Sequence, residues 1–279
     1  MISLYNTVSE KCSKLITHNY STSFSLGILM LDSEYRTPIR NIYGFVRFAD
    51  EIVDTFHHLD KQKLLDEFRQ QTQQAIANNF SINPVLHSFQ LTVNEYGIQQ
   101  GLIDAFLNSM EMDLGKKTYE PDSYSTYIFG SAEVVGLMCL QVFCKGDKTE
   151  YESLAPYARK LGAAFQKINF LRDIKSDFEE RGRVYFPGLD LTKTFDNKAK
   201  SEIEDDIQAD FDYAIIGIRK LPIGSRLGVY IAYLYFYHLL LKIKKQEAKK
   251  LLSSRIRIND FQKIIILIKG WLMHKANSI

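Results

Sequence analysis

The sequence predicts an all-α protein made of a single domain over residues 1–279. Glycine contributes 15 and proline 6 of the 279 residues, too few for a β-sandwich or barrel with many tight turns. Apolar residues recur at helical spacing along most of the chain. No internal repeat and no linker rich in glycine, serine and proline divides it. A helical bundle is therefore expected, with an interior that is either a packed core or a cavity.

The expected helices follow from this spacing and from the residues that interrupt it. Pro38 and Pro84 suit first helical turns, and Pro121 interrupts the middle of the chain. Gly182 and Pro187 end a long helix. In order, the predicted helices cover residues 4–19, 38–55, 61–78, 84–96, 99–114, 123–142, 150–180, 201–219, 224–252 and 260–275.

Composition disfavours several classes of protein. The 35 basic and 33 acidic residues give a net charge of +2, which argues against a nucleic-acid partner. Three cysteines without ligand-like spacing favour neither a disulfide framework nor a zinc site. The most apolar stretch, residues 229–241, would reach about 20 Å against a hydrocarbon core of about 30 Å, so it is predicted to be a core helix. Because Glu10 and Lys11 interrupt the region where a secretory signal would be apolar, a cytoplasmic location is expected.

Two acidic turns carry the first chemical signal. Asp50 and Asp54 lie four residues apart in a predicted helix, so their carboxylates share one face and repel each other. A single pair of this kind usually faces solvent. A second polar stripe, in an otherwise apolar helix, consists of Gln166, Asn169, Asp173 and Asp177. Two such turns among apolar residues favour a metal site, and these hard oxygen ligands suit Mg²⁺, which also takes substrate phosphates.

Basic and hydroxyl side chains accompany both acidic turns. Arg47 lies one helical turn before the first pair, and the hydroxyls of residues 21–23 fall between two predicted helices. Arg172, Arg181 and Arg183 surround the second turn, although a single arginine is most often a surface residue. Magnesium between the four aspartates would reverse the sign of the site, so a diphosphate held by magnesium and arginine is the expected ligand. No glycine-rich phosphate loop appears, which argues against a nucleotide.

The order and spacing of these motifs resemble the squalene/phytoene synthase family. Residues 23–27 and 43–54 are similar to its first acidic motif, residues 161–177 with 182–187 to its second, and residues 127–136 to the segment between them. The resemblance covers residues 10–260. It implies the isoprenoid synthase fold, a helical bundle with a central cavity, aspartates on opposite walls and an apolar tunnel below.

The resemblance further implies head-to-head condensation of two prenyl diphosphates through a cyclopropylcarbinyl diphosphate. Loss of one diphosphate would leave an allylic cation, which the double bond of the second molecule attacks. Mg²⁺, or Mn²⁺ in its place, would be bound by Asp50, Glu51, Asp54, Asn169, Asp173 and Asp177, of which the four aspartates are the implied catalytic residues. The implied substrate contacts are Ser21, Thr22, Ser23, Tyr43, Arg47, Gln166, Arg172, Tyr237 and Arg255.

The sequence departs from the family pattern at two places. Many relatives carry a lysine where Thr22 stands, so one phosphate-binding cation is missing or is replaced by Arg36 or Arg40. Glu51 stands where an aspartate is usual, and its longer side chain would still reach a metal. Near the C-terminus, Tyr237 is matched to a phosphate contact within one or two residues of register.

Phytoene, formed from two geranylgeranyl diphosphates, is the predicted product. Residues 26–28 carry no bulky aromatic side chain, which leaves room for a C20 tail. No nicotinamide cofactor is expected, because phytoene formation ends in proton loss whereas squalene formation needs a hydride. The alternatives are squalene or dehydrosqualene formation from farnesyl diphosphate, and a catalytically silent helical assembly factor. The basic pieces 242–250 and 263–275 predict transient contact with the inner membrane face, or else a solvated amphipathic tail.

Overall fold

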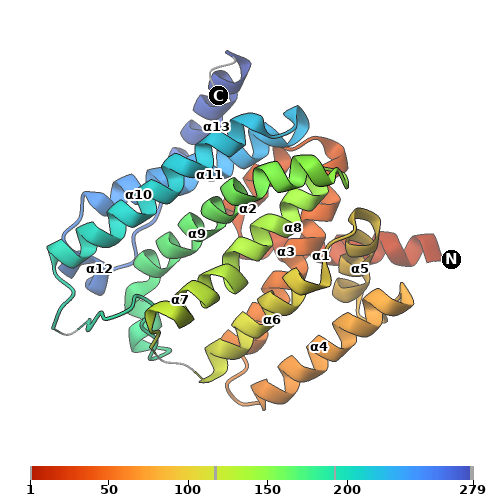
Figure 1. Ribbon diagram of the computed structural model, residues 1–279, viewed down its shortest axis with the longest axis horizontal. Helices are drawn as coiled ribbons and strands as arrows, with labels where there is room; N and C mark the ends of the chain where they lie inside the picture. Colours follow the sequence, from red (N-terminus) through yellow and green to blue (C-terminus); the bar gives the residue numbers. More distant parts are fainter. Residues whose placement is uncertain (1, 116–117, 192, 277–279) are drawn as a thin grey trace.

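The computed structural model describes residues 2–115, 118–191 and 193–276, and over these ranges the fold is helical (Figure 1). Its helices are α1 (Ile2–Tyr20), α2 (Thr22–Leu29), α3 (Ser33–Asp54), α4 (Lys61–Asn78), α5 (Pro84–Tyr96), α6 (Gln100–Gly115), α7 (Pro121–Ile128), α8 (Val134–Phe143), α9 (Lys148–Glu179), α10 (Asn197–Lys220), α11 (Ile223–Lys244), α12 (Ala248–Ser253) and α13 (Asp260–Lys275). A π-helical segment, η1 (Phe129–Glu133), joins α7 to α8. Within the described residues, β-type pairing is limited to an isolated bridge between Thr118 and Val184. The predicted all-α fold is confirmed.

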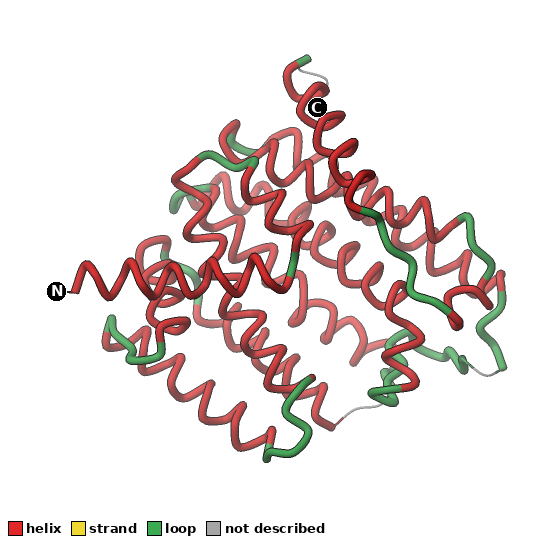
Figure 2. The backbone as a smooth tube through the Cα atoms, turned by 180° about the vertical axis from the view of Figure 1, so that it is seen from behind, coloured by secondary structure: helices red, strands yellow, loops and turns green. Residues whose placement is uncertain are grey.

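Two long helices, α3 and α9, organise the bundle. The helix α3 packs against α1, α5 and α8, whereas α9 packs against α8, α10 and α11. Figure 1 shows α4, α6, α8, α9 and α10 as neighbouring rows across the molecule, and Figure 2 shows the bundle from behind. Because α8 contacts both α3 and α9, it ties together the two helices that carry the acidic turns.

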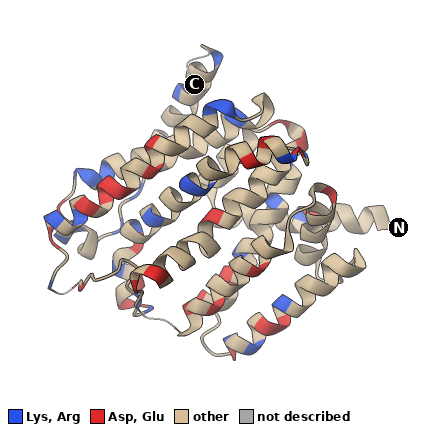
Figure 3. Ribbon diagram, in the orientation of Figure 1, with Lys and Arg blue, Asp and Glu red and all other residues tan. Residues whose placement is uncertain are grey.

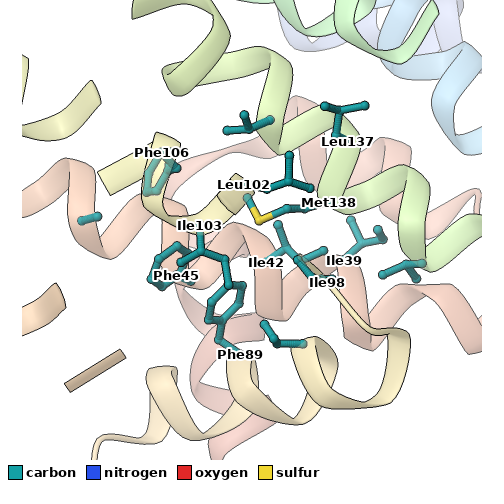
Figure 4. Packing of buried hydrophobic residues seen from close by; sticks show 14 of the residues in the cluster. Ile39, Ile42, Phe45, Phe89, Ile98, Leu102, Ile103, Phe106, Leu137 and Met138 are labelled. Atoms are coloured by element: carbon teal, nitrogen blue, oxygen red, sulfur yellow. The ribbon is translucent and has the colours of Figure 1, made fainter. Parts of the chain in front are cut away.

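Buried apolar side chains form two clusters. The first draws on α3, α5, α6 and α8 and contains Phe45, whose ring stacks on Phe89 at a centroid distance of 3.9 Å (Figure 4). The second draws on α9, α10 and α11 and contains Phe170, whose ring stacks on Tyr185 at 3.9 Å. Fully burying one such side chain stabilises the fold by about 1.5–3 kcal/mol. These clusters hold α3 and α9 rigidly enough to position polar side chains between them.

Capping residues explain why α4 and α5 coincide with the predicted ranges. Asp60 accepts a hydrogen bond from the backbone amide of Lys63 at the start of α4. Asn83 accepts one from the amide of Val85 at the start of α5, next to Pro84. Gly97 ends α5 in the left-handed conformation, with a φ of 64°.

Other helix boundaries differ from the prediction. Residues 22–29 form α2, which was not predicted because its residues are small or apolar and show no helical period. The helix α3 begins at Ser33, so Pro38 lies in its second turn rather than its first, where it costs one backbone hydrogen bond. The predicted helix 123–142 divides at η1. The predicted helix 224–252 ends at Lys244, and the short α12 follows.

One helical stretch, Pro121–Phe143, is long and apolar enough by composition to cross a membrane. However, 56% of its most apolar window is buried inside the bundle, where η1 and α8 contact α6 and α9. A buried core helix passes the same test, so the stretch is weak evidence for a membrane span. The region 229–241 lies within α11 and buries Ile231, Leu239 and Leu240, as predicted for a core helix.

Candidate active site

A cavity of about 760 Å³ is lined by residues of α2, α3, α8, α9 and α11, including members of both apolar clusters. Part of its wall is apolar, with contributions from Ile28, Leu140, Phe143, Leu154 and Leu221. The rest of the lining contains acidic, basic and hydroxyl side chains, many of them from α2, α3 and α9. Such a chamber suits a ligand with one charged end and one hydrocarbon end.

The first acidic turn lies at the C-terminal end of α3. Asp50 and Asp54 both line the cavity. Arg47, one turn earlier, donates hydrogen bonds to the carboxylates of Asp50 and Glu51, and its guanidinium lies 4.3 Å from the centre of the Tyr20 ring. The apolar residues on the opposite face of α3 are buried in the first cluster, which fixes the direction of the two aspartates.

The second acidic turn lies in the C-terminal half of α9. All four predicted residues of its polar stripe line the cavity: Gln166, Asn169, Asp173 and Asp177. Arg172 donates two hydrogen bonds to Asp173, at 3.0 and 2.6 Å, and Arg255 approaches the same carboxylate at 2.6 Å. Ile168 and Leu171 between them are buried, so the stripe cannot rotate away from the cavity.

Arginine side chains join the two acidic turns across the cavity. The guanidinium of Arg181 lies 2.6 Å from Asp177 and 3.4 Å from Asp54, so it touches one aspartate of each helix. Arg183 donates a 3.0 Å hydrogen bond to the other carboxylate oxygen of Asp54. A single arginine side chain therefore contacts the acidic turns of both α3 and α9. A shared diphosphate site requires the two turns to lie this close together.

Burial and crowding disturb the ionisation of these carboxyl groups. Burial, reinforced by repulsion from Asp54, raises the pKa of Asp50 to about 7. The Asp50 side chain is 33% exposed, at the lining of the cavity. Burial also raises the pKa of Asp177 to about 6, against the opposing effect of Arg181. A divalent cation would relieve this excess of negative charge.

The donor atoms fit a hard divalent cation. The side-chain oxygen of Asn169 is buried and has no hydrogen-bond partner, although the residue lines the cavity one turn before Asp173. Carboxylate and amide oxygens are the protein ligands that Mg²⁺ prefers. Among the described residues, no three acidic, histidine or cysteine side chains converge closely enough to hold an ion as they stand. The arginines form ion pairs with the aspartates in this structure, so metal binding would require Arg181 to release Asp54 or Asp177.

The hydroxyl segment of residues 21–23 begins α2 and lines the cavity. The Ser21 hydroxyl caps the helix by accepting a hydrogen bond from the amide of Phe24. Lys263 of α13 donates a 2.8 Å hydrogen bond to the hydroxyl of Thr22 and also lines the cavity. A lysine that is 241 residues away in sequence thus brings a cation to the place where Thr22 lacks one.

This contact corrects the expectation that Arg36 or Arg40 supplies the missing cation. Arg36 donates a hydrogen bond to the backbone carbonyl of Leu31, and neither arginine is among the cavity-lining residues that the structure describes. Arg36 and Arg40 precede the acidic turn on the same helix, α3. Lys263 belongs to α13, which lies near α2 only because of the tertiary fold. No local sequence pattern marks this lysine.

Two further assignments are corrected by the structure. Glu51 pairs with Arg47 and does not line the cavity, because it projects about 100° around α3 from its neighbour Asp50. Tyr237 packs on Phe211 in the second cluster, whereas Tyr235, two residues earlier, lines the cavity. The other predicted substrate contacts do line it: Ser21, Thr22, Ser23, Tyr43, Arg47, Gln166, Arg172 and Arg255.

The structure also contains a buried network that the sequence analysis missed. Asp113 of α6 accepts hydrogen bonds from the hydroxyls of Tyr127, at 2.7 Å, and Tyr119, at 3.1 Å. Arg183 donates to the backbone carbonyl of Asp113 at 2.9 Å and lies 3.8 Å from its carboxylate. Burial raises the pKa of Asp113 to about 6. Asp113 lies in a predicted helix and has no acidic residue three or four positions away, so no local pattern marked it as a site residue.

Comparisons with known proteins agree with this geometry. The family model described as squalene/phytoene synthase matches residues 17–262. The chain is 27% identical to a chloroplastic phytoene synthase of Daucus carota, over 95% of this chain and 70% of that protein. It is 26% identical to a 4,4'-diapophytoene synthase of Staphylococcus haemolyticus, over 70% of this chain and 67% of that protein.

Solved structures share the fold. A dehydrosqualene synthase in complex with a ligand superposes with a TM-score of 0.84 at 19% identity, covering 98% of this chain and 99% of that one. The squalene synthase HpnC of Alicyclobacillus acidocaldarius superposes with a TM-score of 0.76 at 20% identity, covering 91% and 97%. The predicted isoprenoid synthase fold is confirmed.

Proposed function

This chain belongs to the squalene/phytoene synthase family, and from that premise we propose that it joins two geranylgeranyl diphosphates head to head to give phytoene, a step in carotenoid synthesis. Relatives named for phytoene and for 4,4'-diapophytoene synthesis support a head-to-head prenyltransferase. One observation carries the assignment to this chain: the acidic turns of α3 and α9 meet, joined by Arg181, across a cavity that also has an apolar wall.

The charged part of the cavity is suited to bind diphosphate. Arg172, Arg255 and Lys263 bring positive charge to its lining, and the hydroxyls of residues 21–23 add hydrogen-bonding groups beside Lys263. When Mg²⁺ is bound by the aspartate oxygens, it neutralises the charge that develops on a departing diphosphate. Arg172 and Arg255 both pair with Asp173 before substrate arrives, so binding of metal and diphosphate would transfer these arginines from the carboxylate to the phosphate oxygens.

The apolar part of the cavity protects the carbocation from water. Ile28, Leu140 and Leu154 are almost completely buried and offer no group that would add to a cation. Excluding water in this way favours rearrangement and proton loss over capture as an alcohol. Gly27 and Ile28 carry no aromatic ring at this wall, although Phe24 lines it one turn earlier on α2; the small side chain at 27 supports a C20 chain rather than C15.

Product analysis tests this proposal. The purified protein is incubated with Mg²⁺ and either geranylgeranyl or farnesyl diphosphate, with and without a reduced nicotinamide, and the hydrocarbons are identified by chromatography. We expect phytoene from the C20 substrate, with no need for the nicotinamide. Turnover of farnesyl diphosphate alone would overturn the C20 assignment.

The similarity to a 4,4'-diapophytoene synthase favours one alternative, condensation of two farnesyl diphosphates. The same incubation separates it from the first proposal. A protein that turns over neither substrate would instead support the silent assembly factor. Asp54→Asn serves as the inactive control, because it removes a carboxylate that the two arginine bridges share.

A further inference from the structure

The C-terminal helix α13 presents an apolar face to the outside of the molecule. This outer stripe consists of Phe261, Ile264, Ile265, Ile268, Trp271 and Leu272, whose exposed fractions run from 44% to 72%. At about 100° per residue the six side chains fall on one side of the helix. On the other side, Ile266 and Gly270 are buried, and Gly270 packs tightly against Ile231 of α11. The helix is thus apolar on both its inner and its outer face.

An unpartnered apolar stripe of this size marks a surface that contacts something. Figures 1 and 2 show α13 rising from the body of the bundle, with its C-terminal end standing clear. Within the described residues α13 makes its main helix contact with α11, which covers the inner face alone. The stripe would therefore remain in water unless a partner covers it.

The charge around the stripe identifies the kind of partner. Residues 242–279 contain ten basic and two acidic residues, whereas residues 1–241 contain 25 basic and 31 acidic residues. One of the two acids, Asp260, is paired with Lys263. Figure 3 shows Lys and Arg positions, in blue, on the ribbon toward the C-terminal end of α13. In α13 itself, Lys269 and Lys275 are exposed, and the Lys275 ammonium lies 5.8 Å from the centre of the Trp271 ring. An apolar stripe with basic residues beside it is the pattern of an interfacial membrane helix.

We propose that the outer stripe of α13 docks the protein on an anionic bilayer surface. A second copy of the chain fits this face less well, because a symmetric contact would bring two basic borders together. The geometry also serves the cavity, since Lys263 and Arg255 line it and lie in or next to α13. Docking would bring this charged lining close to the bilayer in which prenyl diphosphates dissolve; that benefit rests on the proposed function, whereas the docking itself does not.

The single tryptophan of the chain gives a direct probe, because it lies at the edge of the stripe and is 44% exposed. The full-length protein without substrate is mixed with vesicles of phosphatidylcholine alone or of phosphatidylcholine with phosphatidylglycerol. Fluorescence and flotation are then measured at low and high salt. We expect a blue shift of Trp271 and flotation with the anionic vesicles, both weakened by salt.

Two variants make the test specific. The double variant Ile265→Ser with Ile268→Ser removes apolar area from the stripe at exposed positions, and it should lower partitioning to anionic vesicles by about tenfold or more. The matched control is Ile82→Ser, which changes an isoleucine that is 86% exposed between α4 and α5, and it should float like the wild type. Thermal unfolding of both variants checks that the fold is kept.

Three results would overturn the proposal. They are absence of flotation and of a spectral shift with anionic vesicles, equal flotation of the stripe variant and the wild type, and a dimer in solution that the stripe variant abolishes. Because vesicle binding is read without substrate, an enzyme that binds vesicles but makes no phytoene would contradict the proposed function alone.

Discussion

Replacing Arg183 with glutamine tests whether the buried network holds the first acidic turn in place. The Arg183 side chain is only 8% exposed and donates hydrogen bonds to Asp54, to the backbone carbonyl of Asp113 and to the Tyr185 hydroxyl. Glutamine cannot neutralise the two carboxylates. Breaking a buried ion pair by removing one partner costs about 3–5 kcal/mol, so Arg183→Gln should lower Tm by roughly 10 °C at pH 8.

The pH dependence gives the sharper test. Burial raises the pKa of Asp113 to about 6, whereas Arg183 lowers it, so the variant should raise this pKa further. The folded-state pKa lies above the ordinary value of 3.8, so the contribution of this group to stability is fully present below that value and is lost as pH rises through about 6 in the wild type. In the variant, with its higher pKa, the loss continues to higher pH. At pH 5 the carboxyl is mostly protonated and needs no cation. The difference in Tm between variant and wild type should therefore shrink to about half of its value at pH 8.

Thermal unfolding followed by circular dichroism at pH 8 and pH 5 measures both effects. Arg219→Gln is the matched control, because Arg219 is exposed at the end of α10, and its Tm should stay near that of the wild type. A Tm loss for Arg183→Gln equal to that of the control, or a larger loss at pH 5 than at pH 8, would refute the reasoning.

Three further predictions concern the metal site, helix packing and the diphosphate. Asp50→Asn and Asp173→Asn should each cut turnover by about 10²-fold or more while the helical circular dichroism signal is kept, because they remove charge and not packing; retained turnover in either would contradict the metal role. Gly217→Ala should cost about 1–3 kcal/mol, since its Cβ would lie 2.2 Å from a side-chain atom of α9, whereas Gly101→Ala, with no atom within 4 Å, should be neutral or slightly stabilising. Equal unfolding midpoints for the two glycine variants would show that the helices do not pack so closely. Lys263→Ala should weaken binding of inorganic pyrophosphate with Mg²⁺ by about tenfold in calorimetry, and unchanged affinity would remove this lysine from the diphosphate site.

Local signals predicted much of the helical framework. Capped helices such as α4 and α5 coincide with their predicted ranges, because a cap and a helical period act within a few residues. Helices without such signals were missed or merged. The residues of α2 are apolar or small almost throughout. The break at η1 contains Gly130, where a Cβ would lie 2.6 Å from the backbone oxygen of Ala105 in α6, so it depends on a close helix contact that local spacing does not predict.

Helical spacing in the sequence sets which side chains share a helix face. Asp50 and Asp54 line the cavity together because residues four apart on α3 must project the same way, and the same holds for Asn169 and Asp173 on α9. The tertiary structure alone decided what faces them. Lys263 reaches Thr22 across 241 residues, and Asp113 meets Arg183 across 70. Such contacts depend on how whole helices pack, which no local spacing records.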